Sequence, residues 1–296
     1  MKNKGVFYAL GAYFLWGILP IYWKQLNHVP AIQAFGSRIV SCFLILILLI
    51  TLRKEWPAFK QAVFNRKAIL LFILTGLLLG ANWLTFIWAV STNHIVESSL
   101  GYFINPLVNV ALGVLFLRER LRPMQWVPVG MAAVGVIYLT LQYGSLPWIA
   151  LALAFTFGFY GLLKKTAPTG GLNSMTVEMA FLSIPAIIYF TILGLRGEAV
   201  FTTASPLTLL LLAGTGVITV TPVLLFTAAT RSIPLSLVGI LQYIHPTLQF
   251  LIGVLVYNEA FTKTDLVGYA FVWAALLFFW LEGTLNKSKT IEEEKD

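Results

Sequence analysis

The sequence predicts an all-α integral membrane protein whose ten transmembrane helices form two inverted five-helix repeats. The prediction rests on composition, on the spacing of charged residues and on an internal repeat. The 296 residues are 58% hydrophobic and only 11% charged, with a mean hydropathy of +0.84. A soluble domain usually has about 25% charged residues. This chain has too little polar surface to cover a water-soluble globule of its size.

Long uncharged stretches separate the few charged residues. No Asp, Glu, Lys or Arg occurs between Lys4 and Lys24, or between Arg122 and Lys164. A helix needs about 20 apolar residues to cross a bilayer, so such stretches are transmembrane candidates. The second is long enough for two crossings, and residues 142–147 supply the turn between them.

Ten spans follow from this pattern: 5–23, 33–52, 69–91, 98–117, 124–142, 146–163, 175–194, 207–229, 235–256 and 266–284. The connections are short and leave no room for an extramembrane catalytic domain. Residues 1–143 hold the first five spans and 144–286 the second five. Residues 287–296 form a charged end that we expect to be a solvated cytoplasmic tail.

Lysine and arginine fall mainly on one side of these spans. Sixteen lie on the side of the N-terminus, and only Lys24, Arg196 and Lys263 lie on the other. The positive-inside rule therefore predicts that both termini are cytoplasmic. The bias also explains the net charge of +8 without a nucleic-acid partner. The one cysteine, Cys42, excludes a disulfide framework within the chain.

An internal repeat supports the ten-span count. A shift of 140 residues aligns 84–122 with 224–262 without a gap, so that Pro106 coincides with Pro246 and Glu119 with Glu259. Because each half has an odd number of spans, the two copies must be inserted in opposite orientations. Inverted repeats are typical of secondary transporters, whose solute site lies near the membrane midplane between the repeats.

Two stretches, ANWLTFIWAV at 81–90 and ESSLGYFINPLVN at 97–109, resemble the RarD-type permeases of the EamA group in the drug/metabolite transporter superfamily. YFLWG at 13–17 and GSLP at 144–147 fit the same resemblance, which covers nearly the whole chain. It implies a ten-helix inverted-repeat fold, a bacterial inner-membrane location and transport of a small organic solute, with efflux favoured. It also implies a loose association with chloramphenicol resistance. Asn82 and Trp83, in the first stretch, are candidate solute-site residues.

Two pairs of polar residues occupy corresponding positions in the two halves, each four apart and each bracketing a proline: Asn105 and Asn109 around Pro106, and His245 and Gln249 around Pro246. A proline in a helix removes one backbone hydrogen bond. We therefore predict two broken helices that line the solute site. Alternatively, the polar side chains join helices and the prolines only shape packing. His245 is the only histidine in a predicted midspan and could respond to pH.

Arg38 and Glu178 are charged residues inside predicted spans, and they correspond under the same shift. A charge in the bilayer centre costs at least about 2.5 kcal/mol on insertion scales, so neither should face lipid. Each lies about five residues into its span, from opposite faces, which leaves roughly 15 Å between them. We predict separate cavity or gate residues, with Arg38 holding a carboxylate of the solute. The alternative is that both snorkel to the interfaces. Trp83, Phe86 and Trp88 form either a solute-facing wall or part of the core.

Other features of the sequence have simpler interpretations. Glu119 lies among Arg118, Arg120 and Arg122, which predicts a solvated salt-bridge cluster at the interface. No Gly-rich phosphate loop, Ser/His/Asp set or clustered metal ligands appears, so we expect no cofactor or metal. A lipid-acting intramembrane enzyme would need a cluster of His, Asp or Glu at one face, and a channel would favour rings of like charge. We predict a non-enzymatic secondary transporter, working by alternating access as an exporter.

Overall fold

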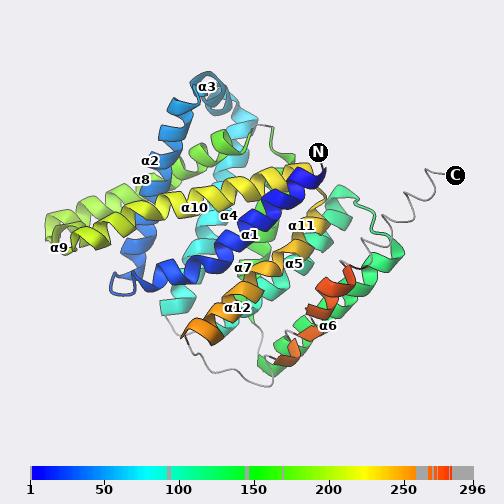
Figure 1. Cartoon of the computed structure of the whole chain (residues 1–296). Helices are drawn as coiled ribbons and strands as arrows, with labels where there is room; N and C mark the ends of the chain where they lie inside the picture. Colours follow the sequence, from blue (N-terminus) through cyan, green and yellow to red (C-terminus); the bar gives the residue numbers. More distant parts are fainter. Residues whose placement is uncertain are drawn as a thin grey trace.

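The computed structural model describes residues 2–91, 95–143, 147–168 and 170–257, and residues 266–281 apart from 269, 272 and 280. These described residues form helices joined by short connections, with no strand among them (Figure 1). Nine helices in this part of the chain are long and apolar enough to cross a membrane, and a shorter apolar helix spans Leu266–Phe279. The predicted all-α membrane fold is therefore confirmed.

The membrane-spanning helices follow the predicted spans closely. They are α1 (Lys2–Lys24), α2 (Ala31–Leu52), α4 (Arg66–Ser91), α5 (Ile95–Leu117), α6 (Trp126–Tyr143), α7 (Trp148–Thr166), α8 (Gly171–Arg196), α10 (Pro206–Ser232), and the pair α11 (Leu235–Gln242) and α12 (Ile244–Tyr257). Shorter helices, α3 (Trp56–Phe64), η1 (Pro123–Gln125) and α9 (Val200–Thr203), lie in connections. The predicted tail, 287–296, lies outside the described residues.

Local sequence signals explain several helix ends. Pro30 precedes α2 in an extended conformation, which suits a residue that cannot donate a backbone hydrogen bond. The Ser205 hydroxyl accepts from the Thr208 N–H at 3.2 Å and so caps α10. Gly197 ends α8 with φ of 71°, a left-handed conformation that glycine adopts without strain.

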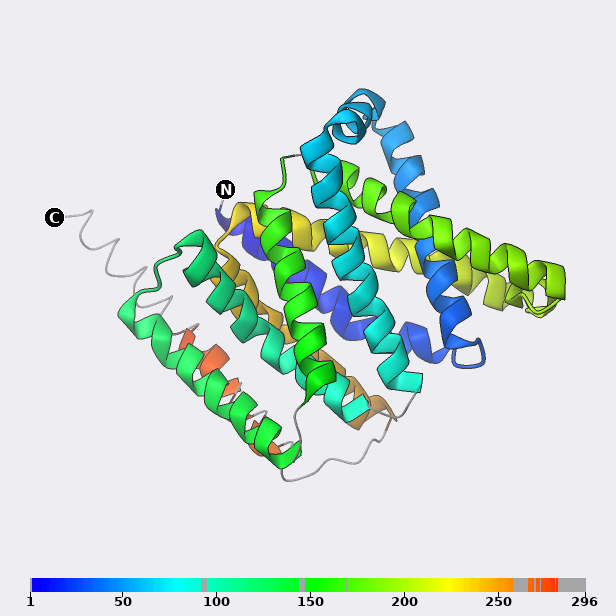
Figure 2. The same ribbon diagram turned by 180° about the vertical axis from the view of Figure 1, so that it is seen from behind.

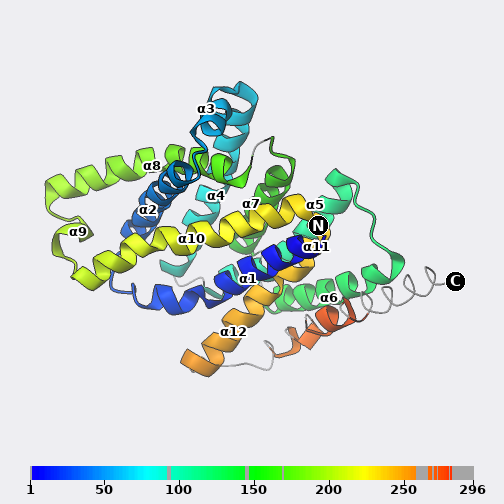
Figure 3. The same ribbon diagram turned by 45° about the horizontal axis from the view of Figure 1, so that its top comes forward.

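Helices of the two halves pack directly against each other. Helix α1 lies along α10, α2 packs on α8 and α10, α4 packs on α7 and α8, and α5 packs on α7 and α11 (Figures 1 and 3). Helix α6 lies at the margin, where Ala132 and Val136 pack against Ala275 (Figure 2). The interface between the halves is therefore also the hydrophobic core of the bundle.

Two ends of the bundle can be named from their short helices. The α3 end holds α3, the ends of α2, α7 and α10, and the starts of α1, α4, α8 and α11. The α9 end holds α9 and the opposite termini of these helices, except that the ninth span reaches it through the end of α12. Helix α3 and the α8–α9–α10 connection lie far apart in Figure 1.

Only one of the two predicted helix breaks is present. Helix α5 continues through Pro106 without interruption, so the prediction of a break there is wrong. The ninth span is interrupted at Tyr243, between α11 and α12. In a helix, the ring of a proline clashes with the carbonyl group four residues earlier. For Pro246 that residue is Gln242, where α11 ends.

A close backbone approach joins α2 to α10. A Cβ atom on Gly216 would lie 2.6 Å from the carbonyl carbon and oxygen of Ser41, a separation that no side chain allows. The contact needs glycine, and it brings the middle of α2 against α10. Arg38 lies one turn before Ser41 and faces Thr219, one turn after Gly216.

Candidate solute-binding site

Arg38 is held between α2, α4 and α10 by neutral groups. Its Nε atom donates to the Thr219 hydroxyl at 2.9 Å. Its guanidinium carbon lies 3.8 Å from the ring centroid of Trp83 and 5.5 Å from that of Trp23. Both separations are within the range of a cation–π interaction. The guanidinium therefore rests on one indole face and lies close to a second.

The charge of Arg38 has no carboxylate partner among the described residues. The residue lies seven positions past Ala31, the start of α2 at the α9 end, which corresponds to about 10 Å of helix rise. It is half-buried in the helix bundle. Since Nε binds Thr219, the two terminal nitrogens of the guanidinium remain as hydrogen-bond donors.

A row of aromatic rings lies within the bundle. The Tyr102 ring centroid lies 6.0 Å from that of Phe86. The same ring meets His245 edge-on at 4.8 Å. His245 in turn lies 6.3 Å from Trp16. Trp16, Phe86 and Tyr102 are each half-buried although they lie within membrane-spanning helices.

The structure thus brings together two of the predicted site residues, Arg38 and Trp83, and places His245 in the aromatic row. It adds Tyr102 and Trp23, which were not among the predicted site residues. Tyr102 lies within the ESSLGYFINPLVN stretch, so its place in the resemblance was the available signal. Trp88, a candidate for the same wall, instead packs against Trp148 at 5.4 Å and is 41% exposed.

Asn105 and Asn109 lie deeper, and their described contacts mainly join helices. Asn105 donates to the Ala154 carbonyl of α7 at 2.6 Å. Asn109 donates to the Gln242 side chain of α11 at 2.9 Å, and to Asn105 at 3.1 Å. These bonds favour the helix-joining interpretation of the pair. Gln249 is half-buried on α12.

Asn82 also connects two helices. Its amide donates to the Leu153 carbonyl and to the Thr156 hydroxyl of α7, both at 2.9 Å. This fixes α4 against α7, one residue before the Trp83 ring that carries the Arg38 guanidinium. Asn82 therefore helps to hold the α4 segment that contains Trp83 in place.

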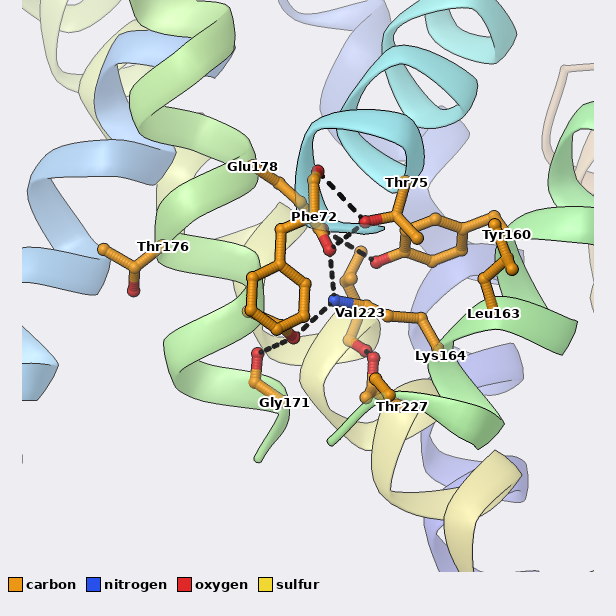
Figure 4. A network of polar contacts seen from close by, with 12 residues as sticks. Phe72, Thr75, Tyr160, Leu163, Lys164, Gly171, Thr176, Glu178, Val223 and Thr227 are labelled. Carbon is orange, nitrogen blue, oxygen red and sulfur yellow. Dashed lines mark hydrogen bonds and ion pairs between the residues drawn. The ribbon is translucent and has the colours of Figure 1, made fainter. Parts of the chain in front are cut away.

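Glu178 lies in the other half of the membrane from Arg38. It is seven positions into α8 from the α3 end and is fully buried. Its carboxylate forms an ion pair with Lys164 of α7 at 2.6 Å (Figure 4). The sequence pattern placed Lys164 among the interfacial bases, but the structure buries it completely. The sequence signal was weak, because Lys164 lies two residues before the end of α7, whereas Glu178 lies seven positions into α8.

Glu119 is not a member of a solvated salt-bridge cluster, contrary to the sequence-based prediction. Its carboxylate accepts hydrogen bonds from the backbone N–H groups of Leu235 and Ser236, at 2.6 and 2.9 Å, and from the Ser236 hydroxyl at 2.7 Å. Pro234 precedes α11 and provides no side-chain cap. Glu119, just past the end of α5, therefore supplies the missing N-terminal cap of α11. Lys165 lies 3.7 Å from the same carboxylate.

A multi-helix membrane bundle with a charged, aromatic site between its halves has the architecture of a membrane permease. The chain belongs to the EamA-like transporter family, which matches residues 3–141 and again residues 146–281. One match lies in each half of the chain. Among the described residues, no group of three or more His, Cys, Asp or Glu side chains is placed to hold a metal ion.

Curated relatives place the chain among the RarD-type members of this family. It is 43% identical to Protein RarD of Salmonella typhi over 288 residues, which cover 97% of this chain and 98% of that protein. It is 43% identical to an uncharacterized transporter of Vibrio cholerae over 281 residues, covering 95% and 93% of the two chains. It is 32% identical to the Chloramphenicol-sensitive protein RarD of Pseudomonas aeruginosa, covering 94% and 93%.

A solved crystal structure shares the fold. It superposes with a TM-score of 0.70 over 94% of this chain and 98% of that chain, at 16% sequence identity. At this identity, the likeness shows the fold alone.

Proposed function

We propose that the protein is a secondary permease of the bacterial inner membrane, and that it exports a small organic anion with a planar aromatic group. This proposal rests on the surroundings of the Arg38 guanidinium. Its guanidinium lies inside the bundle against Thr219 and Trp83, without a carboxylate among the described residues. A carboxylate on the solute would compensate this charge through two parallel hydrogen bonds.

The aromatic part of the proposed solute follows from the neighbours of Arg38. The rings of Trp23 and Trp83 lie on two helices against the guanidinium, and the half-buried rings of Phe86 and Tyr102 lie against each other on α4 and α5. Aromatic pairs gain about 0.5–1.5 kcal/mol beyond the burial of their area. An aromatic carboxylate would therefore bind both the Arg38 guanidinium and the aromatic rings, whereas an aliphatic carboxylate would bind only the guanidinium.

The basic residues support an orientation for this site. The excess of lysine and arginine at the α3 end favours a cytoplasmic position for that end. Arg38 then lies in the outer half of the membrane. In the alternating-access scheme expected for inverted repeats, the solute reaches Arg38 from the cytoplasm in one state and leaves outward in the other.

Four compounds test the proposal on detergent-purified protein: benzoate, cyclohexanecarboxylate, benzylamine and chloramphenicol. The last is an uncharged aromatic, chosen because the Pseudomonas relative is named for chloramphenicol sensitivity. Trp23 and Trp83 make intrinsic fluorescence a direct readout of binding. We expect saturable binding of benzoate that is tighter than that of cyclohexanecarboxylate, and no saturable binding of benzylamine.

Variants of Arg38 separate charge from geometry. Arg38→Lys keeps the charge but loses the planar fork, so benzoate should bind more weakly. Arg38→Gln should lose about tenfold or more in affinity, since hydrogen bonds to charged groups contribute about 1.5–3 kcal/mol. Arg196→Gln, at the exposed end of α8, is the matched control. Wild-type affinity in Arg38→Gln, at an unchanged melting temperature, would contradict the binding role.

A further inference from the structure

A fully buried ionic network joins three helices near the α3 end. The Lys164 and Glu178 side chains are both 0% exposed, and their charged atoms are 2.6 Å apart. The Thr75 hydroxyl of α4 donates to the same carboxylate oxygen at 2.6 Å. The Tyr160 hydroxyl of α7 donates to the other oxygen at 3.4 Å. Figure 4 shows these side chains converging from α4, α7 and α8.

The remaining charged groups around the pair come from neighbouring elements. Lys164 also donates to the Ser174 hydroxyl at 2.7 Å. Arg231 on α10 donates to the Ala167 carbonyl, just past the end of α7, at 2.9 Å. Glu55, which follows α2, accepts a hydrogen bond at 3.4 Å from Asn173, the residue before Ser174. Among the described residues, Glu178 is therefore the carboxylate that compensates Lys164.

Stability alone does not explain such a pair. Well-packed apolar residues often replace a buried ion pair with no loss of stability, whereas removal of one member leaves an uncompensated buried charge. An ionisable group inside a membrane bundle is accordingly a functional candidate, and carboxylates in this setting commonly relay protons. Neither side chain has exposed surface, so a proton is the ligand that fits this arrangement.

We propose that Glu178 is a proton-binding residue of the transport cycle, and that its protonation releases Lys164 and unlocks α8 from α4 and α7. The carboxylate takes a proton from hydronium, which leaves water and a neutral carboxylic acid. The ammonium group of Lys164 then lacks its counter-charge. Water must reach it, and the α3 end opens.

The coupling works in both directions. If protonation favours an open α3 end, then opening must favour protonation by the same factor. This relation is what proton-coupled transport requires, because a ligand shifts a conformational equilibrium only through different affinities for the two states. The proposal concerns the coupling ion. It does not depend on the identity of the solute at Arg38.

The first experiment observes the proton itself. Infrared difference spectra of the purified protein are recorded as the pH is lowered. We expect a carbonyl band from one protonated buried carboxyl group that is absent from Glu178→Gln. The band should persist in Glu198→Gln, an identical change in the exposed connection between α8 and α9, and in His245→Gln, which removes the buried imidazole of the aromatic row. Persistence of the band in Glu178→Gln would overturn the proposal, as would its absence from the wild type.

The second experiment observes the opening at one fixed pH. A cysteine replaces Val223, which is 1% exposed on α10, in a Cys42→Ser background. Helix α10 packs against both α7 and α8. Glu178→Gln imitates the protonated residue and should speed thiol labelling by about tenfold or more, since losing one member of a buried pair strongly destabilises the closed arrangement. Glu178→Asp and Glu198→Gln should label as slowly as the parent.

An apolar double variant is the control for misfolding. Lys164→Met with Glu178→Leu removes both charges, so it should remain closed, label slowly and lack the carbonyl band. Equal labelling rates in Glu178→Gln and the parent would show that the pair does not lock this end. Both readouts omit any solute, so a failure of benzoate binding at Arg38 leaves them unaffected.

Discussion

Replacing Glu119 by alanine removes a helix cap that one half of the protein supplies to the other. The variant loses three hydrogen bonds of 2.6 to 2.9 Å to Leu235 and Ser236. An N-cap contributes about 0.5–2 kcal/mol, and charge-assisted hydrogen bonds are roughly twice as strong as neutral ones. The partly exposed pair with Lys165, at 3.7 Å, adds little. The expected loss is about 2–4 kcal/mol.

The loss should appear as a lower melting temperature in detergent. For a chain of this size, 1 kcal/mol corresponds to about 2 °C, so Glu119→Ala should melt about 4–8 °C lower. Glu119→Gln keeps one accepting oxygen and should lose roughly half as much. Glu198→Ala, an exposed glutamate at the α9 end, is the control. If Glu119→Ala and Glu198→Ala melt at the same temperature, the cap does not hold α11.

Two further predictions concern orientation and packing. In a Cys42→Ser background, a cysteine at Glu198 should react with an impermeant thiol reagent added to intact cells, whereas one at Phe64, 82% exposed on α3, should not; labelling at Phe64 would reverse the proposed orientation. The sequence also predicts that Asn93 and Gly144 lie on the outer side of the membrane; both lie outside the described residues. It predicts that Asn173 lies on the cytoplasmic side, but this residue is only 6% exposed and is therefore a poor labelling site. Gly216→Ala places a Cβ 2.6 Å from the Ser41 backbone, so it should cost about 1–3 kcal/mol and weaken benzoate binding through the Arg38–Thr219 contact. Gly130→Ala, where a Cβ meets nothing within 4 Å, should show neither effect.

The sequence predicted the helices well because hydropathy alone decides which segments cross a membrane. Every predicted boundary of the first nine spans lies within four residues of the observed one. Arg38 was also identifiable, because a basic residue inside a span needs compensation inside the protein. The opposite insertion of the two repeats stays a prediction.

Other features depended on packing that no single segment encodes. Lys164 is near a helix end, so the sequence favoured an exposed residue; α8 and α10 bury it. Glu119 appeared to belong with its arginine neighbours, yet its partners are 116 and 117 positions away. The symmetric prolines predicted symmetric breaks, but α5 continues through Pro106 and the span that contains Pro246 is interrupted.

The interruption at Tyr243 divides one membrane span between two different sets of neighbours. Helix α11 is attached to α5 through the Glu119 cap and the Asn109–Gln242 bond, whereas α12 packs mainly along α1. The turn lies two residues before His245. The residue that the ninth span contributes to the aromatic row therefore belongs to the part that packs on α1, and not to the part that is joined to α5.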